Sequence, residues 1–335
     1  MRIPYTCILF GVGQTGQCAA RLLRRRGALI IAAYSRHSHI GADLGVLSEG
    51  LASGLDVRAV HPQEPLPAGV DVALFCTTGR PDDLLDQAQR CLSAGINVIT
   101  LAEGAFYPWT YAPQVAGQLH AAALRGRATL LASGFQDSIM LHLVAALSAS
   151  SVSPDAIDMH VYSDFSRLGA GSARRMQLGS AVDDFDAQVS KTHDAGPPMS
   201  TSGQVIEALA SRLGVGAPVM EYQLSPVVAR SDLYSAQLET VLAAGSVSGM
   251  EETVTGRTPS GMILTCRLTA RLFEPEDQEF FTCVIRGPTP LELRVSPLHS
   301  LEATVATMIN RIPQIIAAAP GFVSADQLPS PHHQS

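Results

Sequence analysis

A glycine-rich turn near the N-terminus constrains the fold of this chain more than any other feature. Residues 11–16, GVGQTG, follow the apolar run TCILF and precede a stretch with helical spacing of apolar residues. In a strand–turn–helix unit, these glycines permit the tight turn, the approach of a pyrophosphate and close packing of helix on strand. The start of the helix favours the anion. The turn therefore predicts a dinucleotide site at Gly11, Val12, Gly13, Gln14, Thr15 and Gly16; the alternative is a turn without a ligand.

Strand and helix patterns alternate through the first third of the chain. Strands are predicted at 6–13, 28–35, 55–61, 69–78, 96–101 and 128–133, and helices at 14–27, 80–95 and 110–125. This alternation indicates a parallel sheet with helices on both faces. A long apolar helix is predicted at 134–150.

The pattern changes after that helix. Strands are predicted at 155–166, 217–229, 245–258, 261–274, 278–287 and 291–297, with helices near 171–189 and 202–213 and a last helix at 300–321 that Pro313 should bend. Alternating apolar and polar residues in several of these strands indicate an antiparallel sheet with one polar face.

These patterns predict an α/β chain of two domains. The first is a doubly wound Rossmann sheet at 1–135, joined by the C-terminal helix at 300–330. The second is an α+β domain at 136–299 with an open, mostly antiparallel sheet. A length of 335 residues suits two domains.

Composition excludes several classes of protein. The net charge is −7 and no basic face is evident, because the run RLLRRRG at 21–27 is expected at the end of a helix, so no nucleic-acid partner is predicted. The longest apolar stretch, 139–149, is short and contains His142, so no membrane span is predicted. The six cysteines lack metal-ligand spacing and are expected to be buried thiols in a cytoplasmic protein without a signal peptide or a metal.

The end of the second strand bears on the choice of dinucleotide. An acidic residue there would accept the ribose 2′-hydroxyl of NAD, but this chain has Ser35, Arg36 and His37. Hydroxyl groups and a guanidinium suit a 2′-phosphate. The sequence therefore predicts NADP(H), with NAD(H) as the alternative if Arg36 is only a solvated loop residue.

Three further strand ends should line the crevice where α/β sheets bind ligands. Cys76, Thr77 and Thr78 end the fourth strand and could line the ribose and nicotinamide. Ala102 and Glu103 end the fifth strand. A carboxylate near apolar surroundings costs free energy unless it is paired or used. Glu103 could act as a base or stabilise a cationic nitrogen next to the hydride; the alternative is a surface glutamate at the start of the next helix.

Four segments carry a resemblance to a known group of enzymes. They are GVGQTG at 11–16, HIGADLG at 39–45, NVITLAEGAFYPW at 97–109 and ATVATMINRIPQIIAAAPGFVSADQLP at 303–329. Together they resemble the dihydrodipicolinate reductase-like superfamily, and within it 2,4-diaminopentanoate dehydrogenases and native amine dehydrogenases. The resemblance implies a homodimer that interconverts an amine with a ketone or aldehyde plus ammonia, using NAD(P). It also implies that Glu103 is the catalytic glutamate and that 136–299 binds substrate and dimerises.

Departures from the family pattern affect the substrate pocket. The paired histidines and the lysine of dihydrodipicolinate reductases are absent, which argues against that activity. A Gly-His-Val-Gly segment of relatives is replaced by KTHDAGPPMS at 191–200, and Gly104 stands where a second glutamate is common. Candidate substrate-binding residues are Tyr107, Phe135, Gln136, Arg167 and His193, with core packing, a surface arginine cluster and a loop histidine as the alternatives. Asn310 would touch the cofactor if the last helix folds back on the first domain.

The sequence therefore predicts an NADPH-dependent amine dehydrogenase that carries out reductive amination of a small carbonyl compound with ammonia. Two alternatives stay open. One is an imine or carbonyl reductase of the same superfamily that does not use ammonia. The other is a sensor that binds NADPH without turnover.

Overall fold

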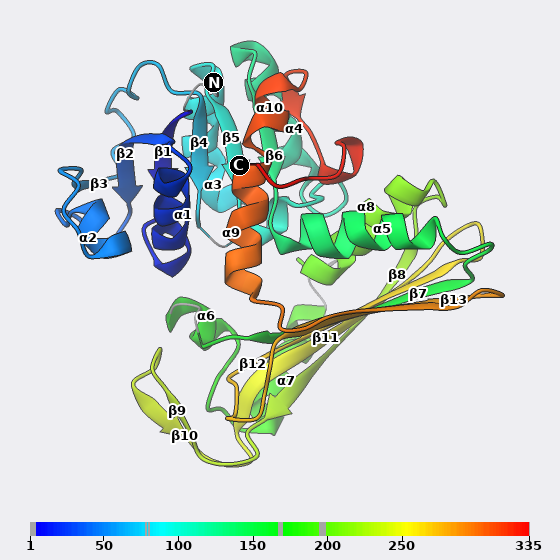
Figure 1. Cartoon of the computed structure of the whole chain (residues 1–335). Coiled ribbons are helices and arrows are strands. Elements are labelled where there is room, and N and C mark those ends of the chain that lie inside the picture. Colours follow the sequence, from blue (N-terminus) through cyan, green and yellow to red (C-terminus); the bar gives the residue numbers. More distant parts are fainter. Residues whose placement is uncertain (1–4, 78, 80, 167–169, 194–198, 335) are drawn as a thin grey trace. The chain divides into compact units, whose positions relative to one another are not determined.

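A computed structural model describes residues 5–77, 79, 81–166, 170–193 and 199–334 of the chain. The chain divides into two compact units. One combines Met1–His142 with Leu301–Ser335, and the other is Leu143–Ser300 (Figure 1). One unit is built on a parallel sheet and the other on a mostly antiparallel sheet, which confirms the predicted α/β fold class.

The first unit contains a seven-stranded sheet in which every neighbouring pair is parallel. Its strands, in sheet order, are β15 (Gly321–Phe322), β6 (Thr129–Ala132), β5 (Asn97–Thr100), β4 (Val72–Phe75), β1 (Thr6–Phe10), β2 (Leu29–Ser35) and β3 (Val57–Ala59). The order reverses between β1 and β4. In open α/β sheets, ligands bind beyond the C-terminal strand ends at such a reversal.

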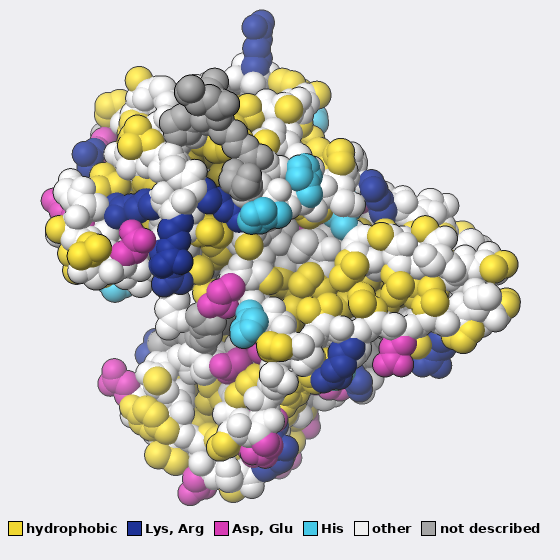
Figure 2. Space-filling model, in the orientation of Figure 1, with side chains coloured by type: hydrophobic (Ala, Val, Ile, Leu, Met, Phe, Trp, Pro, Cys, Tyr) yellow, Lys and Arg dark blue, Asp and Glu magenta, His cyan; other side chains and the backbone are white. Residues whose placement is uncertain are grey.

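Helices connect these strands. They are α1 (Gln14–Arg25), α2 (Leu44–Glu49), α3 (Pro81–Ser93), α4 (Pro113–Gly126), α9 (Ser300–Asn310) and α10 (Ile312–Ala317), with short 3₁₀ turns η1 (Glu103–Ala105) and η3 (Ala325–Gln327). The last helix breaks at Arg311, and Pro313 lies in the first turn of α10, as expected for a proline that cannot continue a helix. Basic side chains gather over α1 in Figure 2, and Arg24 and Arg25 lie in its last turn, where they complement the helix dipole.

The core of the first unit lies against the sheet beneath the strand ends. Phe10, the last residue of β1, stacks on Tyr34 and Phe75 with ring centroids 4.9 and 4.4 Å apart. All three side chains are at least 96% buried. Burial of each aromatic side chain contributes about 1.5–3 kcal/mol, so the floor under the crevice is firmly packed.

The second unit contains a six-stranded sheet. Its strands, in sheet order, are β14 (Leu291–Val295), β13 (Phe280–Arg286), β7 (Ala156–Asp164), β12 (Ile263–Arg271), β11 (Val247–Arg257) and β8 (Val219–Val228). Only the β7–β12 pair is parallel. The unit also contains α5 (Val144–Ser148), α6 (Ala170–Arg175), α7 (Val182–His193), α8 (Thr201–Leu213) and a hairpin of β9 (Leu233–Ser235) and β10 (Thr240–Leu242).

The two faces of this sheet differ as the alternating pattern predicted. On β7, Ile157, Met159 and Val161 are buried, and α8 packs against β11 and β12. Side chains on the opposite face of β7, such as His160 and Tyr162, are half-buried within the single chain.

Two helical segments lie where they were predicted but differ in detail. The helix predicted at 134–150 begins as a π-helix, η2 (Gln136–Leu143), and continues as α5. The helix predicted at 171–189 is two helices, α6 and α7.

All six cysteines are free and buried, as expected. Across the described part of the chain, no helix has both the length and the apolar character that a membrane span requires.

Candidate functional site

The C-terminal ends of five strands lie level at one edge of the first sheet. The residue after each of β1, β4, β5 and β6 donates its N–H to the last or next-to-last carbonyl of a neighbouring strand, and these four bonds connect the ends of β2, β1, β4, β5 and β6. Gly11 bonds Tyr34, Cys76 bonds Phe10, Leu101 bonds Phe75 and Ser133 bonds Thr100, at 2.7–3.0 Å. Because neighbouring strands lie about 4.8 Å apart, the end of β5 is about 10 Å from the glycine turn after β1.

Each glycine of the turn at 11–16 has a distinct structural reason. Gly11 has φ = +90°, and a Cβ there would lie 2.8 Å from the Cys76 carbonyl oxygen. A Cβ on Gly16 would lie only 2.0 Å from the Gly11 carbonyl oxygen, whereas a Cβ on Gly13 would have no atom within 4 Å. Gly11 and Gly16 are therefore required by the fold itself. Gly13 is not, so its lack of a side chain is suited to a ligand that approaches the backbone.

The start of α1 offers donors to that ligand. Gly13 is the N-cap and provides no side-chain hydrogen bond to the helix. The first N–H groups of a helix and its dipole together attract anions. Cys76 packs beside Gly16, and burial raises the pKa of its thiol well above the usual range, with nearby Cys18 adding to the effect. The wall of the turn is thus a neutral thiol that does not repel a pyrophosphate. The residues fit a dinucleotide.

The segment after β2 holds the residues predicted to choose between NADP and NAD. Ser35 is buried, and its Oγ accepts the Ser38 N–H at 3.2 Å. Arg36 and His37 are exposed. Arg36 Nη2 donates to the carbonyl of Asp83 in the first turn of α3, and this contact uses one of the five N–H donors of the guanidinium. An exposed arginine fixed at the strand edge suits a phosphate ligand.

Glu103 begins η1, directly after β5, and is half-buried. Its loop is held on both sides. Thr100 Oγ1 accepts the Ala102 N–H at 3.0 Å, and the Gly104 N–H donates to the Gly79 carbonyl, in the loop after β4, at 3.4 Å. The carboxylate therefore starts from an anchored backbone at the strand edge that the glycine turn shares. Cys76 and Thr77 follow β4 at the same edge, while predicted Thr78 lies outside the described residues.

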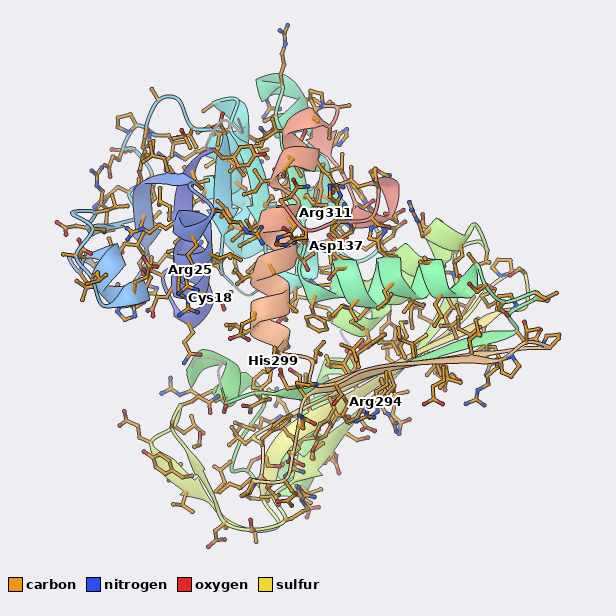
Figure 3. All side chains as sticks on the ribbon, in the orientation of Figure 1. Cys18, Arg25, Asp137, Arg294, His299 and Arg311 are labelled. Atoms are coloured by element: carbon orange, nitrogen blue, oxygen red, sulfur yellow. The ribbon has the colours of Figure 1, made fainter. Side chains whose placement is uncertain are left out.

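A buried charge network lies at the corner between β6 and η2, and sequence reasoning missed it. Arg311 and Asp137 form a bidentate ion pair, with Nη2–Oδ1 at 2.5 Å and Nε–Oδ2 at 2.8 Å. Both side chains are 0% exposed (Figure 3). Ser133 Oγ donates to Asp137 Oδ2 at 2.7 Å. His142 Nε2 lies 2.8 Å from Arg311 Nη2, and its Nδ1 lies 3.2 Å from Ser330 Oγ. Opposite charges at 137 and 311 on otherwise apolar helices were the only signal in the sequence.

Two threonines of α9 and Arg311, the residue that follows α9, form a polar stripe at this corner. Thr304, Thr307 and Arg311 are spaced i, i+3 and i+7, so they lie on one helix face. Thr304 Oγ1 accepts the Phe135 N–H at 3.3 Å, and Thr307 Oγ1 lies 2.8 Å from Ser138 Oγ. The C-terminal helix thus fixes the chain as it leaves β6.

The structure brings some predicted substrate-binding residues to this edge. Tyr107 follows η1 and is half-buried. Phe135 and Gln136 belong to the β6–η2 corner, where Phe135 is half-buried and Gln136 is buried. Arg167 lies outside the described residues. His193 is the last residue of α7, and the structure does not describe its side chain. Their substrate contacts stay predictions.

Asn310 occupies a different place from the glycine turn. Its Oδ1 accepts Arg26 Nη1 at 2.7 Å and the Gln334 N–H at 3.1 Å. Arg26 is the C-cap of α1, at the opposite end of that helix from the turn. The last helix does fold back on the first unit, but a contact of Asn310 with the cofactor stays a prediction.

A polar and aromatic cluster lies on the half-buried face of the second sheet. Tyr162 stacks on Phe273 and Phe280, with centroids 5.2 and 5.3 Å apart. His160 Nε2 lies 3.0 Å from Thr269 Oγ1, and Arg267 Nη2 donates to His160 Nδ1 at 3.1 Å. Burial and the Arg267 charge lower the pKa of His160 to about 4, so the ring is neutral at pH 7.

Comparisons with known proteins agree with this architecture. Residues 138–334 match the family described as the 2,4-diaminopentanoate dehydrogenase C-terminal domain. The 2,4-diaminopentanoate dehydrogenase of Acetoanaerobium sticklandii is 24% identical over 334 residues, which cover 97% of this chain and 93% of that protein.

Solved structures are also similar. An amine dehydrogenase from Mycobacterium smegmatis has a TM-score of 0.92 at 27% identity, covering 99% of this chain and 98% of that one. The dipicolinate-bound dihydrodipicolinate reductase of Paenisporosarcina sp. TG-14 has a TM-score of 0.51 at 13% identity, covering 96% and 98%, which shows a shared fold. These findings confirm the resemblance read from the sequence.

Proposed function

Because the chain belongs to the 2,4-diaminopentanoate dehydrogenase C-terminal domain family and is an amine dehydrogenase-like, NAD(P)-dependent dehydrogenase, we propose that it catalyses reductive amination of a small ketone or aldehyde with ammonia, and the reverse deamination. The observation that carries this proposal is the position of Glu103. Glu103 is half-buried and follows β5 at the sheet edge that holds the glycine turn.

The glycine turn and the start of α1 would hold the pyrophosphate of the dinucleotide. Cys76 and Thr77 would border the ribose next to it, with the backbone of Ala102 at the nicotinamide end. When bound in its reduced form, the cofactor supplies a hydride to the carbon that becomes the amine carbon. The protein's own task is to hold the reacting carbon and nitrogen in place and to manage protons on the nitrogen.

Glu103 is suited to that proton task. When ammonia adds to a carbonyl carbon, one proton moves from the nitrogen to the oxygen. A second proton, taken from the medium, lets the hydroxyl group leave as water, so the substrate becomes an iminium cation. A carboxylate nearby can accept a proton and stabilises the cation electrostatically. The anchored backbone on both sides of Glu103 supports this role, because a group that reacts must be held in one position.

We propose NADPH as the preferred cofactor. Arg36 is exposed at the end of β2, its guanidinium is steadied by the Asp83 carbonyl, and Ser35 and His37 flank it. No acidic residue follows β2 directly, where NAD-dependent folds place one.

We further propose that Leu143–Ser300 binds the substrate and forms a homodimer. The half-buried face of its sheet carries stacked aromatic rings and hydrogen-bonded polar groups, a composition typical of surfaces between protein copies. Light scattering after size-exclusion chromatography tests the dimer, because a single chain would elute at 35.4 kDa.

The activity is tested by NADPH oxidation with a panel of ketones and aldehydes, with and without ammonium. We expect turnover that requires ammonium, and we expect Glu103→Gln to lower kcat by about 10²- to 10⁴-fold. Glu49→Gln, at the end of α2, is the matched control and should leave kcat unchanged.

Two outcomes would replace the proposal. Turnover that does not need ammonium would identify an imine or carbonyl reductase. Tight NADPH binding, measured by calorimetry, with no turnover on any carbonyl compound or cyclic imine would identify a sensor.

A further inference from the structure

Asp137 and Arg311 are the most deeply buried opposite charges described in the first unit, and the proposed chemistry does not use them. Arg311 lies in the segment 303–329 that carries part of the family resemblance, but the sequence analysis assigned a structural role there only to Pro313. A buried ion pair is weak evidence for stability, because apolar side chains of similar size often stabilise as well. A role in fixing the position of other groups accounts better for its presence.

A continuous set of hydrogen bonds leads from this pair to the Glu103 loop. Asp137 Oδ2 accepts Ser133 Oγ at 2.7 Å, and the Ser133 N–H donates to the Thr100 carbonyl at 3.0 Å. Thr100 Oγ1 in turn accepts the Ala102 N–H at 3.0 Å. The peptide that precedes Glu103 is therefore connected to the buried guanidinium through two strand ends.

The residues in this set leave little room for alternative arrangements. Thr100, Ser133, Asp137 and Arg311 are all 0% exposed, and Ala102 is 2% exposed. The Ala102 carbonyl accepts the Ala105 N–H at 2.9 Å, which closes the turn that begins with Glu103. Because Thr100 and Ala102 are buried, removal of the Thr100 hydroxyl would leave the Ala102 N–H without a hydrogen-bond acceptor in the interior.

The segment that follows β6 has an unusual helical geometry. It is the π-helix η2 rather than an α-helix, and π-helical turns occur frequently at functional sites. Thr304 and Thr307 of α9, together with Arg311, the residue that follows α9, fix the first residues of this segment. The geometry points to a rigid support behind the strand edge where Glu103 lies.

We propose that Asp137 and Arg311 are positioning residues that act through Ser133 and Thr100 to hold the Glu103 loop in its reactive position. This inference rests on the proposed role of Glu103. Position matters because a shift of about 1 Å in a reacting group can lower the rate of an enzyme about 10²-fold.

The first test replaces Thr100, the member of the set nearest to Glu103. Thr100→Val keeps the shape and removes the acceptor, and we expect kcat to fall about 10- to 100-fold with an unchanged Kd for NADPH. Thr100→Ser keeps the hydroxyl and should restore most of the lost rate. Thr129→Val is the matched control, since Thr129 is equally buried at the start of β6, where its Oγ1 donates to the Ala319 carbonyl at 3.2 Å.

The second test measures the loop directly. Hydrogen–deuterium exchange of peptides that cover 101–107 should become faster in Thr100→Val and Asp137→Asn, and not in Thr129→Val. Arg311→Lys keeps the charge but loses bidentate binding, so its exchange should lie between wild type and Asp137→Asn.

Combined variants separate this inference from the proposed function. If Thr100 acts through Glu103, adding Thr100→Val to Glu103→Gln should lower kcat no further, because the group being positioned is already lost. Wild-type kcat and wild-type exchange in Thr100→Val, or additive losses in the double variant, would overturn the positioning role. Full turnover by Glu103→Gln would overturn the proposed role of Glu103, whereas unchanged exchange of peptides 101–107 in Thr100→Val and Asp137→Asn would overturn the support of the loop by the buried pair, so the two failures are distinguishable.

Discussion

Two corners of the first sheet lie at the same edge and are built in opposite ways. The corner after β1 consists of backbone, with Gly11 and Gly16 in contact and an exposed helix start. The corner after β6 consists of buried charge, with Asp137 and Arg311 closed to solvent. The first is open for a ligand to supply the missing partner of its N–H groups. The second has all its partners inside the protein and so serves to hold position.

The same difference separates two arginines. Arg36 is exposed and held by one backbone carbonyl. Arg311 is 0% exposed and chelates a carboxylate. Charge that faces solvent is available for recognition, whereas charge that is buried must be matched within the fold. Substitutions at the two corners should therefore affect different measurements.

The largest effect is expected at the glycine turn. Gly16→Ala places a Cβ 2.0 Å from the Gly11 carbonyl, so the backbone must move, and we expect a loss of about 3 kcal/mol or more in unfolding free energy, measured by urea titration. Gly13→Ala is the matched comparison, because its Cβ meets no atom within 4 Å. It should keep the stability of the unliganded protein and weaken only dinucleotide binding. Equal losses of unfolding free energy in Gly16→Ala and Gly13→Ala would contradict the inference that the fold requires a glycine at 16 but not at 13.

A second large effect is expected at the charged corner. Asp137→Asn leaves Arg311 buried beside a neutral side chain, which should lower the unfolding free energy by about 3–5 kcal/mol. Replacing both partners, as in Asp137→Leu with Arg311→Met, should cost less than Asp137→Asn because no unpaired charge remains. Thermal unfolding of wild type, Asp137→Asn, the single variants Asp137→Leu and Arg311→Met, and the double variant checks this; a double variant as unstable as the sum of its two single variants would argue against a paired charge.

A smaller effect separates the arginines. Arg36→Ala should weaken NADPH binding by about 1.5–3 kcal/mol, the value of hydrogen bonds to a charged group, and leave NADH binding and stability unchanged. Arg125→Ala, an exposed arginine in the last turn of α4, is the control. Calorimetric titration with both cofactors checks this. Equal loss for NADPH and NADH would mean that Arg36 does not recognise the 2′-phosphate.

The smallest effect concerns the outer part of the charged corner. Ser330→Ala removes the partner of His142 Nδ1, and we expect a loss of about 0.5–1.5 kcal/mol in unfolding free energy. Ser296→Ala, an exposed serine after β14, should lose less. If Ser330→Ala lowered the unfolding free energy as much as Asp137→Asn, the stability of the network would depend on the Ser330–His142 contact as strongly as on the Asp137–Arg311 ion pair.

The two corners also differ in how far the sequence predicts them. The glycine turn is a local constraint, so six consecutive residues between a strand and a helix were sufficient. The charged corner joins residues 174 positions apart in the chain. A single sequence does not reveal which distant charges meet, although Asp137 and Arg311 each interrupt an apolar helical pattern.

Other differences between prediction and structure have simple causes. The π-helical geometry of η2 was not predicted, because the spacing of apolar residues over eight positions does not distinguish i+4 from i+5 hydrogen bonding. The six-residue α2 and the three-residue strands β9 and β10 are too short to show a period. The parallel pairing of β7 with β12 was also invisible, because alternation gives the buried face of a strand but not the direction of its neighbour.

The discontinuity of the first unit has a consequence for its synthesis. β6 pairs with β15, and Asp137 pairs with Arg311, so one partner of each pair is synthesised before Leu143–Ser300 and the other only after it. The nascent chain must carry an unneutralised Asp137 while the later unit is being made, although domains ordinarily fold in the order of translation. The first unit therefore cannot complete its sheet or its buried ion pair until Leu143–Ser300 has been synthesised.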